Sequence, residues 1–285
     1  PQHWQAILAT NNRPAPMVLR VNRRRVGRDD YLQTLRAQGL LAEPVGRDGI
    51  ALAQAVAVDR LPGWEQGHCS VQDLAAQLAA PLLLDGADLP AGARVLDACA
   101  APGGKTAHLL ECAELDLLAL DVDPQRCDRI QDNLQRLGLK AELRAADAAD
   151  TARWWDGRAF DAILLDAPCT ASGIVRRHPD VRWLRRPGDI AQLAAQQLRL
   201  LEALWPTLGA GGRLLYCTCS VFKAEGEQQV RDFLQRHPDA QLLPSPGHLM
   251  PGEPAEAWLG GSVGSDNLVG MDGFFYALLL KRPAG

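Results

Sequence analysis

The stretch RVLDACAAPGGKT, residues 94–106, determines the fold that we expect. Its first residues are typical of a short buried strand, and the small residues after them predict a tight turn into a helix. Such a turn lets a ligand approach the backbone, and the helix N-terminus offers unpaired N–H groups to a carboxylate. The turn has neither G-x-G-x-x-G nor the P-loop spacing, which disfavours a dinucleotide or ATP. On these residues alone, a tight turn without a ligand stays the alternative.

Apolar runs and helical periodicity alternate along the chain from residue 94 onward. We expect strands at residues 94–97, 117–121, 141–145, 162–166 and 213–217, and helices at 125–137 and 190–208. Alternating β and α elements predict an α/β fold with a parallel, doubly wound sheet. The Gly- and Pro-rich residues 244–273 predict a long loop beside the active site, and residues 273–281 predict a last strand.

The first 65 residues differ in character and predict a small α+β subdomain, which leaves residues 66–285 for a larger domain. Within this subdomain we expect a strand at 17–21, a helix at 29–38 and a further apolar segment at 50–58. The sequence Ser70-Val71-Gln72-Asp73 has the spacing of a capping box and predicts the start of a helix.

Composition excludes several classes of protein. The 285 residues are 47% hydrophobic and 22% charged, which is ordinary for a globular protein. No apolar run approaches the roughly 18–20 residues that span a bilayer, and no signal sequence opens the chain, so we expect a cytoplasmic protein. The seven cysteines are irregularly spaced without a C-x-x-C pair, which predicts neither a metal site nor a disulfide framework.

Positive charge is clustered although the net charge is −4. Phosphate contacts come from local clusters, so the negative total does not exclude a nucleic-acid partner. Solvated surface is the alternative for either cluster taken alone. The first cluster contains Arg20, Arg23, Arg24, Arg25 and Arg28, and the second contains Arg176, Arg177, Arg182, Arg185 and Arg186.

Carboxylates follow successive predicted strands, at the sheet edge where open α/β folds bind ligands. Asp121 ends the second strand and can accept hydrogen bonds from both hydroxyls of a ribose. Asp123 could do so instead, but Asp123-Pro124 is more typical of a helix start. Asp147 follows the third strand and could receive an adenine amino group.

Two cysteines follow neighbouring strands at the same edge. Cys169 lies in Asp166-Ala167-Pro168-Cys169, and Cys219 follows the strand after it. A thiolate that adds to C6 of a cytosine turns C5 into a nucleophile, and a carboxyl group such as Asp166 assists by hydrogen bonding at N3. The target base must then leave its stack. The residues alone leave open which cysteine attacks.

The motifs LDACAAPGGKT, LDAPCTASG and YCTCSV resemble those of the NOL1/NOP2/Sun family of RNA 5-methylcytosine methyltransferases. The stretches IVRRHPDVRWLRR and DGFFYALLLK resemble bacterial members that act on 16S rRNA, and the resemblance covers residues 4–281. It implies a Rossmann-like class I methyltransferase fold that binds S-adenosylmethionine. It further implies methyl transfer to C5 of a specific cytosine in 16S rRNA through a covalent cysteine–C6 adduct.

The resemblance also implies residue roles. Cys219 is expected to be the nucleophile and Cys169 to assist product release, the reverse of DNA cytosine methyltransferases. Lys105 and Asp166 are expected to face the reaction centre, and Cys217 to be a packing residue. The implied cofactor contacts are Cys99, Ala100, Ala101, Pro102, Gly103, Gly104, Lys105, Asp121, Asp147 and Asp166. The implied RNA contacts are Arg20, Arg23, Arg24 and Arg25, to which the second cluster adds Arg176, Arg177, Arg182 and Arg185.

The resemblance is incomplete at the N-terminus. The bacterial relatives begin with a helical NusB-like RNA-binding domain, which nothing here matches, so we expect the chain to start just after it. Residues 1–65 resemble the family's RNA-binding subdomain, and we expect a monomer. Other readings are the same chemistry on tRNA or another rRNA site, a non-catalytic ribosome-assembly factor, and an NAD-dependent oxidoreductase.

Overall fold

The computed structural model describes residues 4–252, 258 and 270–283. This part of the chain contains a sheet of seven strands in the order β10-β11-β9-β8-β5-β6-β7. Strands β5 to β9 pair in parallel, whereas β11 is antiparallel to β9 and to β10. The strands are β5 (Ala93–Asp97), β6 (Leu115–Asp121), β7 (Glu142–Ala145), β8 (Phe160–Asp166), β9 (Leu208–Thr218), β10 (Ala240–Leu249) and β11 (Phe274–Lys281). The predicted strands of the larger domain are therefore confirmed.

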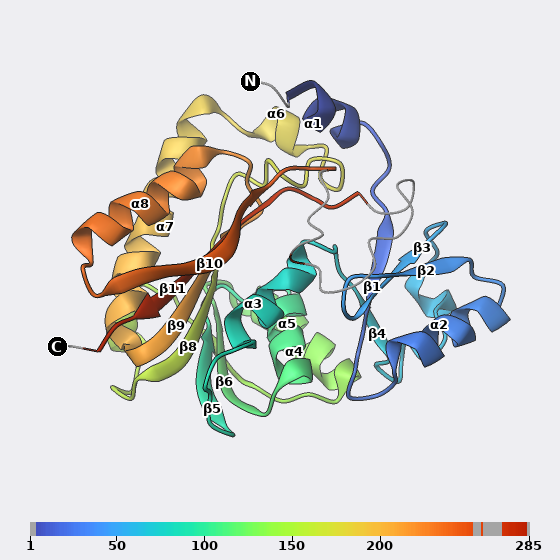
Figure 1. Cartoon of the computed structure of the whole chain (residues 1–285), viewed down its shortest axis with the longest axis horizontal. Coiled ribbons are helices and arrows are strands. Elements are labelled where there is room, and N and C mark those ends of the chain that lie inside the picture. Colours follow the sequence, from blue (N-terminus) through green and yellow to red (C-terminus); the bar gives the residue numbers. More distant parts are fainter. Residues whose placement is uncertain (1–3, 253–257, 259–269, 284–285) are drawn as a thin grey trace.

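Helices cover both faces of this sheet, as the alternating pattern predicted (Figure 1). On one face lie α3 (Ala79–Leu84), α4 (Gly104–Cys112) and α5 (Pro124–Leu137), and on the other lie α7 (Pro187–Leu204) and α8 (Glu227–Arg236). Successive strand residues point to opposite faces of the sheet. Val95 therefore packs in the core under α3, α4 and α5, and Leu96 packs in the core under α7 and α8. Both are 0% exposed, which explains why the strands are continuously apolar.

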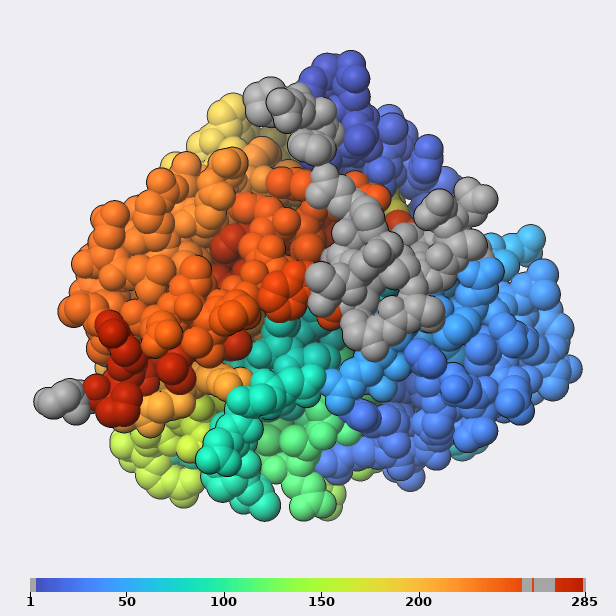
Figure 2. Space-filling view, in the orientation of Figure 1, coloured from blue at the N-terminus to red at the C-terminus, as the bar shows by residue number. Residues whose placement is uncertain are grey.

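A smaller sheet of four strands lies N-terminal to the larger one in the described chain. Its order is β2-β3-β1-β4, and α2 packs on it through the buried Tyr31 and Leu35. The elements are α1 (Trp4–Asn11), β1 (Met17–Val21), α2 (Arg28–Ala37), β2 (Ala42–Val45), β3 (Gly49–Leu52) and β4 (Cys69–Val71). Strand β4 lies beyond residue 65, and the domain boundary there stays a prediction. Figure 2 shows this smaller part against the body of the molecule.

The predicted helix start at Ser70 is wrong. Residues Cys69–Val71 form β4, because they pair with β1 across the small sheet. The cap lies later: the Asp73 carboxylate accepts the backbone N–H of Ala75 at 2.9 Å, and helical turns begin with η2 (Ala76–Leu78). The spacing was misleading because pairing with β1 satisfies the backbone of residues 69–71 as a strand.

Two further expectations need correction. The predicted loop at residues 244–273 begins inside β10, which extends to Leu249 by pairing with β11. Residues 253–257 and 259–269 of that loop lie outside the described residues. The helix predicted at 190–208 ends at Leu204, because Trp205–Thr207 form the tighter turn η4 before β9 begins. The predicted apolar segment 50–58 begins within β3, which ends at Leu52. The turn η1 (Val58–Arg60) begins at the last residue of the segment.

Short elements complete the connections: η3 (Thr151–Arg153), α6 (Val181–Leu184) and η5 (Lys223–Glu225). Helix α6 lies beside α1 (Figure 1), and Arg182 of α6 donates to the backbone carbonyl of Asn11 at 2.8 Å. No helix among the described residues is long and apolar enough to cross a membrane.

Candidate active site

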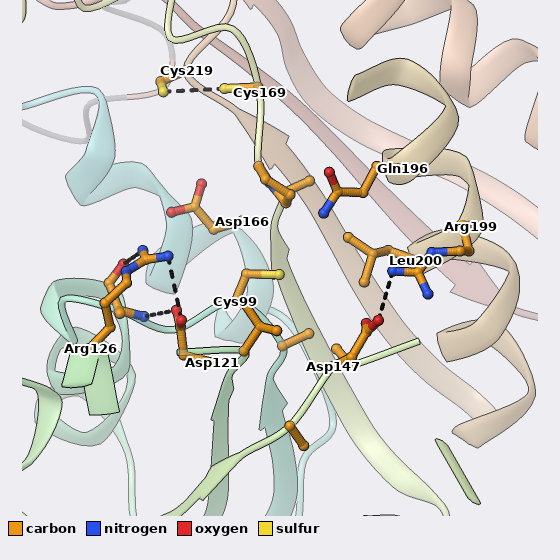
Figure 3. A pocket seen from close by; sticks show the side chains of 17 residues that line it. Cys99, Asp121, Arg126, Asp147, Asp166, Cys169, Gln196, Arg199, Leu200 and Cys219 are labelled. Carbon is orange, nitrogen blue, oxygen red and sulfur yellow. Dashed lines mark hydrogen bonds and ion pairs between the residues drawn. The ribbon is translucent and has the colours of Figure 1, made fainter. Parts of the chain in front are cut away.

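A cavity of about 280 Å³ opens at the carboxyl ends of the parallel strands (Figure 3). Asp121 ends β6, Asp166 ends β8, and Asp147 follows β7 by two residues. These carboxylates line the cavity together with Cys169 and Cys219. The sheet edge thus brings together side chains that are up to about 100 residues apart in sequence, as parallel topology requires.

The turn between β5 and α4 forms one wall of the cavity. Gly103 has φ 94°, and a Cβ there would lie 3.1–3.2 Å from atoms of Ile130, so glycine fits both the backbone and the space. Asn133 donates to the carbonyl of Pro102 at 2.8 Å, which holds the turn against α5. Cys99 and Ala101 line the cavity.

The structure describes the other predicted turn contacts, and they are not among the cavity's lining residues: Ala100, Pro102, Gly103, Gly104 and Lys105. Their cofactor contacts stay predictions.

Asp121 is held in place by the same turn. Its carboxylate accepts the backbone N–H of Ala101 at 3.2 Å and that of Asp123 at 3.1 Å, and Arg126 lies 3.4 Å away. Asp123 instead caps α5 by accepting the N–H of Gln125 at 2.9 Å. Because Asp123 is engaged there, Asp121 is the carboxylate that faces the cavity (Figure 3).

Asp147 meets helix α7 across the cavity (Figure 3). Arg199 lies 2.8 Å from its carboxylate, and the N–H of Ala149 donates to it at 3.0 Å. Partial burial raises the pKa of Asp147, but these two donors outweigh it and hold the pKa below its usual range. Gln196 and Arg199 line the cavity as well, and sequence reasoning missed both. Polar residues on an amphipathic helix carry no local signal that they face a ligand.

Lys105 and Asp166 form an ion pair at 2.6 Å, and Asp166 lines the cavity. Burial alone would lower the pKa of Lys105, but the Asp166 carboxylate outweighs it and raises that pKa above its usual value, so Lys105 is cationic. The other Asp166 oxygen lies 3.5 Å from the Cys217 thiol. Cys217 is fully buried, as expected for a packing residue, but it also contacts Asp166, which sequence reasoning missed.

The sulfur atoms of Cys169 and Cys219 lie 3.4 Å apart (Figure 3). The contact with Cys169, together with burial and the nearby Asp166, raises the pKa of the Cys219 thiol well above its usual value, although Lys105 opposes this. Cys219 is therefore a protonated thiol at neutral pH in the absence of a substrate.

The structure corrects the prediction for two of the arginines. Arg20 is 1% exposed and lies 2.8 Å from the buried Glu111 carboxylate, so it cannot contact a phosphate. The side chain of Arg176 is 3% exposed and pairs with Asp272 at 2.6 Å. Both predictions failed because clustering in sequence does not reveal which arginine points inward.

The remaining predicted RNA contacts stay predictions. Arg23, Arg24, Arg25, Arg182 and Arg185 are exposed, and Arg177 is partly buried in ion pairs with Asp73 and Asp272. Arg185 also donates to the carbonyl of Thr170 at 3.0 Å and to that of Cys169 at 3.3 Å, which places it beside the loop that carries Cys169.

Two protein-family models match this chain. Residues 87–280 match the model of the 16S rRNA methyltransferase RsmB/F family. The chain belongs to the RsmB/F family. Residues 1–59 match a second model, the ferredoxin-like domain of RsmF/B-like methyltransferases.

Relatives in the RsmB/F family are similar over the whole chain. The ribosomal RNA small subunit methyltransferase B of Pseudomonas syringae is 50% identical over 100% of this chain and 63% of its own length. That of Serratia proteamaculans is 45% identical over 99% of this chain and 63% of its own length. The chain thus spans less than two thirds of these curated relatives.

Among solved structures, a methyltransferase homologue from Pyrococcus horikoshii is 28% identical, with a TM-score of 0.77 over 96% of this chain and 89% of its own. NSun6 from the same organism shares the fold at 20% identity, with a TM-score of 0.81 over 99% of this chain and 95% of its own. The fold of the larger domain is therefore that of class I methyltransferases.

Proposed function

We propose that the chain transfers a methyl group from S-adenosylmethionine to C5 of a cytosine in 16S rRNA. The observation that carries this proposal is the pair of cysteine thiols 3.4 Å apart, beside the Lys105–Asp166 ion pair and at the end of the cavity. Covalent activation of a pyrimidine needs such a nucleophile, a second group for release and a polar partner for the ring.

The cavity fits S-adenosylmethionine as cofactor. Asp121 is fixed by the turn and presents a carboxylate, the group that accepts ribose hydroxyls at this strand end in related nucleotide sites. Cys99 and Ala101 line the wall next to it, and Asp147 lies at the far side. The cofactor, when bound, supplies an electrophilic methyl group. NSun6 from Pyrococcus horikoshii, which has the same fold, was solved with the ligand SFG, which supports a ligand-binding role for this fold.

We assign the attack on C6 of the cytosine to Cys219. Its sulfur gives an electron pair to C6, the C5–C6 π electrons form a C4–C5 double bond, and the N3–C4 π electrons move to N3, which takes up a proton through the Asp166 carboxyl group. C5 then carries the nucleophilic electron pair that takes up the methyl group. The resting Cys219 is protonated, so its thiol proton leaves as the sulfur attacks and balances the proton that N3 takes up.

We assign product release to Cys169. After methyl transfer, a base must remove the C5 proton so that the C5–C6 double bond re-forms and the Cys219 sulfur leaves. Cys169 lies 3.4 Å from Cys219, so it is close to any ring bonded to that sulfur. The Lys105 ammonium holds Asp166 at 2.6 Å and keeps its carboxyl group oriented throughout.

RNA is the partner that the exposed cations favour. Arg182 and Arg185 lie on or next to α6, and Trp183 between them is 86% exposed, which offers a stacking surface for an unpaired base. A target cytosine has to leave its stack, so a single-stranded or poorly paired site costs least. The same chemistry on tRNA or another rRNA site is the alternative.

The experiment that tests the proposal mixes the chain with 16S rRNA and S-adenosylmethionine and looks for a protein–RNA adduct on a denaturing gel. We expect methylation by the wild type, neither methylation nor adduct with Cys219→Ala, and an accumulating adduct with Cys169→Ala. Cys112→Ala, at the end of α4 and away from the cavity, serves as the control and should resemble the wild type. Methylation by Cys219→Ala would refute the assigned nucleophile, and methylation of another RNA in place of 16S rRNA would refute the substrate.

A further inference from the structure

A buried carboxylate lies between the two loops that carry Cys169 and Cys219. Glu225, at the end of η5, is 0% exposed. Its backbone carbonyl accepts the hydroxyl of Tyr216 at 2.8 Å and that of Thr218 at 3.3 Å, so the turn is fastened to the end of β9. The side chain consequently has a fixed position from which to contact both loops.

The carboxylate contacts the residue that follows each cysteine. Thr170 donates to it through its backbone N–H at 2.9 Å and through its hydroxyl at 2.5 Å. Ser220 donates its hydroxyl to the same oxygen as the Thr170 hydroxyl, also at 2.5 Å. One carboxylate thus holds both cysteine-bearing loops at positions 50 residues apart in sequence.

Helix α7 completes the arrangement. Gln197, which is 0% exposed, donates to the Glu225 carboxylate at 3.1 Å and to the carbonyl of Pro168 at 2.9 Å. The residues on both sides of Cys169 are therefore tied to Glu225, directly or through Gln197. Four hydrogen bonds to one carboxyl group leave it little freedom to move, which makes this anchor stiff.

No arginine or lysine forms an ion pair with Glu225 among the residues that the structure describes. A buried polar group gains little net stability from its hydrogen bonds, because desolvation offsets most of what they supply. Its benefit is geometric, since every donor must adopt one position to satisfy it.

We propose that Glu225 is a positioning residue that sets the separation of Cys169 and Cys219, and so governs release of the methylated base. This inference rests on the proposed function, in which Cys169 acts on the adduct made by Cys219. If the anchor loosens, the cysteines drift apart, and release slows more than cofactor binding does. A displacement of about 1 Å at a reacting group can cost about 100-fold in rate.

The first test compares Glu225→Gln with Glu227→Gln, a matched removal of one charge two residues away. Glu227 is exposed and pairs with Lys223 at 3.0 Å, outside the network. We expect Glu225→Gln to lower kcat about tenfold or more and to prolong the covalent adduct, with the Kd for S-adenosylmethionine within about twofold of the wild type. Glu227→Gln should match the wild type in all three. Equal adduct lifetimes in the two variants overturn the proposal.

A second test reads the spacing of the thiols without RNA. Phenylarsine oxide, hydrated to PhAs(OH)₂, forms two As–S bonds with a close dithiol, and the two thiol protons leave with the two hydroxyls as water. Mass spectrometry locates the bridge. We expect the Cys169–Cys219 bridge to form in the wild type and in Glu227→Gln, and to form at least about tenfold more slowly in Glu225→Gln.

If Glu225→Gln does not fold, Ser220→Ala tests the proposal instead. This variant removes the hydroxyl donor of Ser220 and leaves the buried Glu225 carboxylate in place. Slower bridging in Ser220→Ala supports the proposal, and bridging at the wild-type rate overturns it. If the wild type methylates no RNA, the proposed function fails, but the arsenical comparison still tests the role of Glu225 in spacing the cysteines.

Discussion

The replacement Arg20→Met tests whether Arg20 stabilises the fold or binds RNA. Arg20 of β1 donates to both oxygens of Glu111 at 2.9 and 2.8 Å, to Gln72 at 2.5 Å and to the carbonyl of Gly104 at 2.8 Å. Glu111 belongs to α4, so the contact joins the small sheet to the helix that follows the turn between β5 and α4. The side chains of Arg20 and Glu111 are 0% and 1% exposed.

The magnitude follows from this burial. Methionine has a similar length but leaves the Glu111 carboxylate buried without a partner, which costs about 3–5 kcal/mol. Arg153→Met is the matched control, because Arg153 pairs with Asp150 at 2.9 Å while 82% of its side chain is exposed. Such surface pairs contribute about 0–1 kcal/mol.

Urea unfolding and thermal melting of both variants provide the assay. At about 2–4 °C per kcal/mol for a domain near this size, Arg20→Met should lower Tm by about 6–20 °C and Arg153→Met by a few degrees at most. A loss of stability in Arg20→Met no larger than in Arg153→Met would refute the buried-pair reasoning. If Arg20 instead contacted a phosphate, the variant would melt normally and the salt dependence of RNA binding would weaken.

Further predictions concern pH, the cofactor and RNA. Burial raises the pKa of Asp97 to about 7, against a hydrogen bond from Thr106, so its folded-state pKa exceeds the unfolded value of 3.8. The stability that this group contributes is complete below pH 4 and is lost as the pH rises through 7. Asp97→Asn should therefore remove this contribution to the fall in the free energy of unfolding between pH 4.5 and 7.5. An unchanged fall contradicts the assignment. Asp121→Asn should weaken binding of S-adenosylmethionine about tenfold or more in isothermal titration, since a charged hydrogen-bond acceptor is lost, and an equal Kd argues against a ribose contact. The side chain of Arg23 is 40% exposed and can therefore contact a phosphate. Arg23→Ala should reduce the slope of log K for RNA binding against log salt concentration by about 1. An unaltered slope means that Arg23 does not contact the RNA.

The elements of the larger domain could be predicted because their signals are local. Apolar runs such as residues 162–166 and the small-residue turn at 98–104 carry their own conformational preferences, and the order of strands and helices fixes a parallel sheet. Once the sheet is parallel, its carboxyl edge must gather Asp121, Asp166 and the loops that follow. The carboxylates and cysteines of the candidate site were therefore predictable, whereas Gln196 and Arg199 on α7 were not.

Local patterns failed where a distant partner determined the conformation. The capping-box spacing at Ser70 was overridden by pairing of β4 with β1, and the apparent loop at 244–249 was extended into β10 by β11. Propensity is a weak preference of fractions of a kcal/mol per residue, so hydrogen bonding to a neighbouring strand outweighs it.

The sequence by itself determined the doubly wound fold, the small-residue turn at 98–104 and the two cysteines at the sheet edge, because each depends on residue types close together in the chain. Only the tertiary structure decided that Arg20 and Arg176 point inward, that the two thiols lie 3.4 Å apart and that Glu225 anchors both of their loops. Burial and hydrogen-bond partners are set by contacts across 50 to nearly 100 residues, as between Arg20 and Glu111, and no local pattern encodes them.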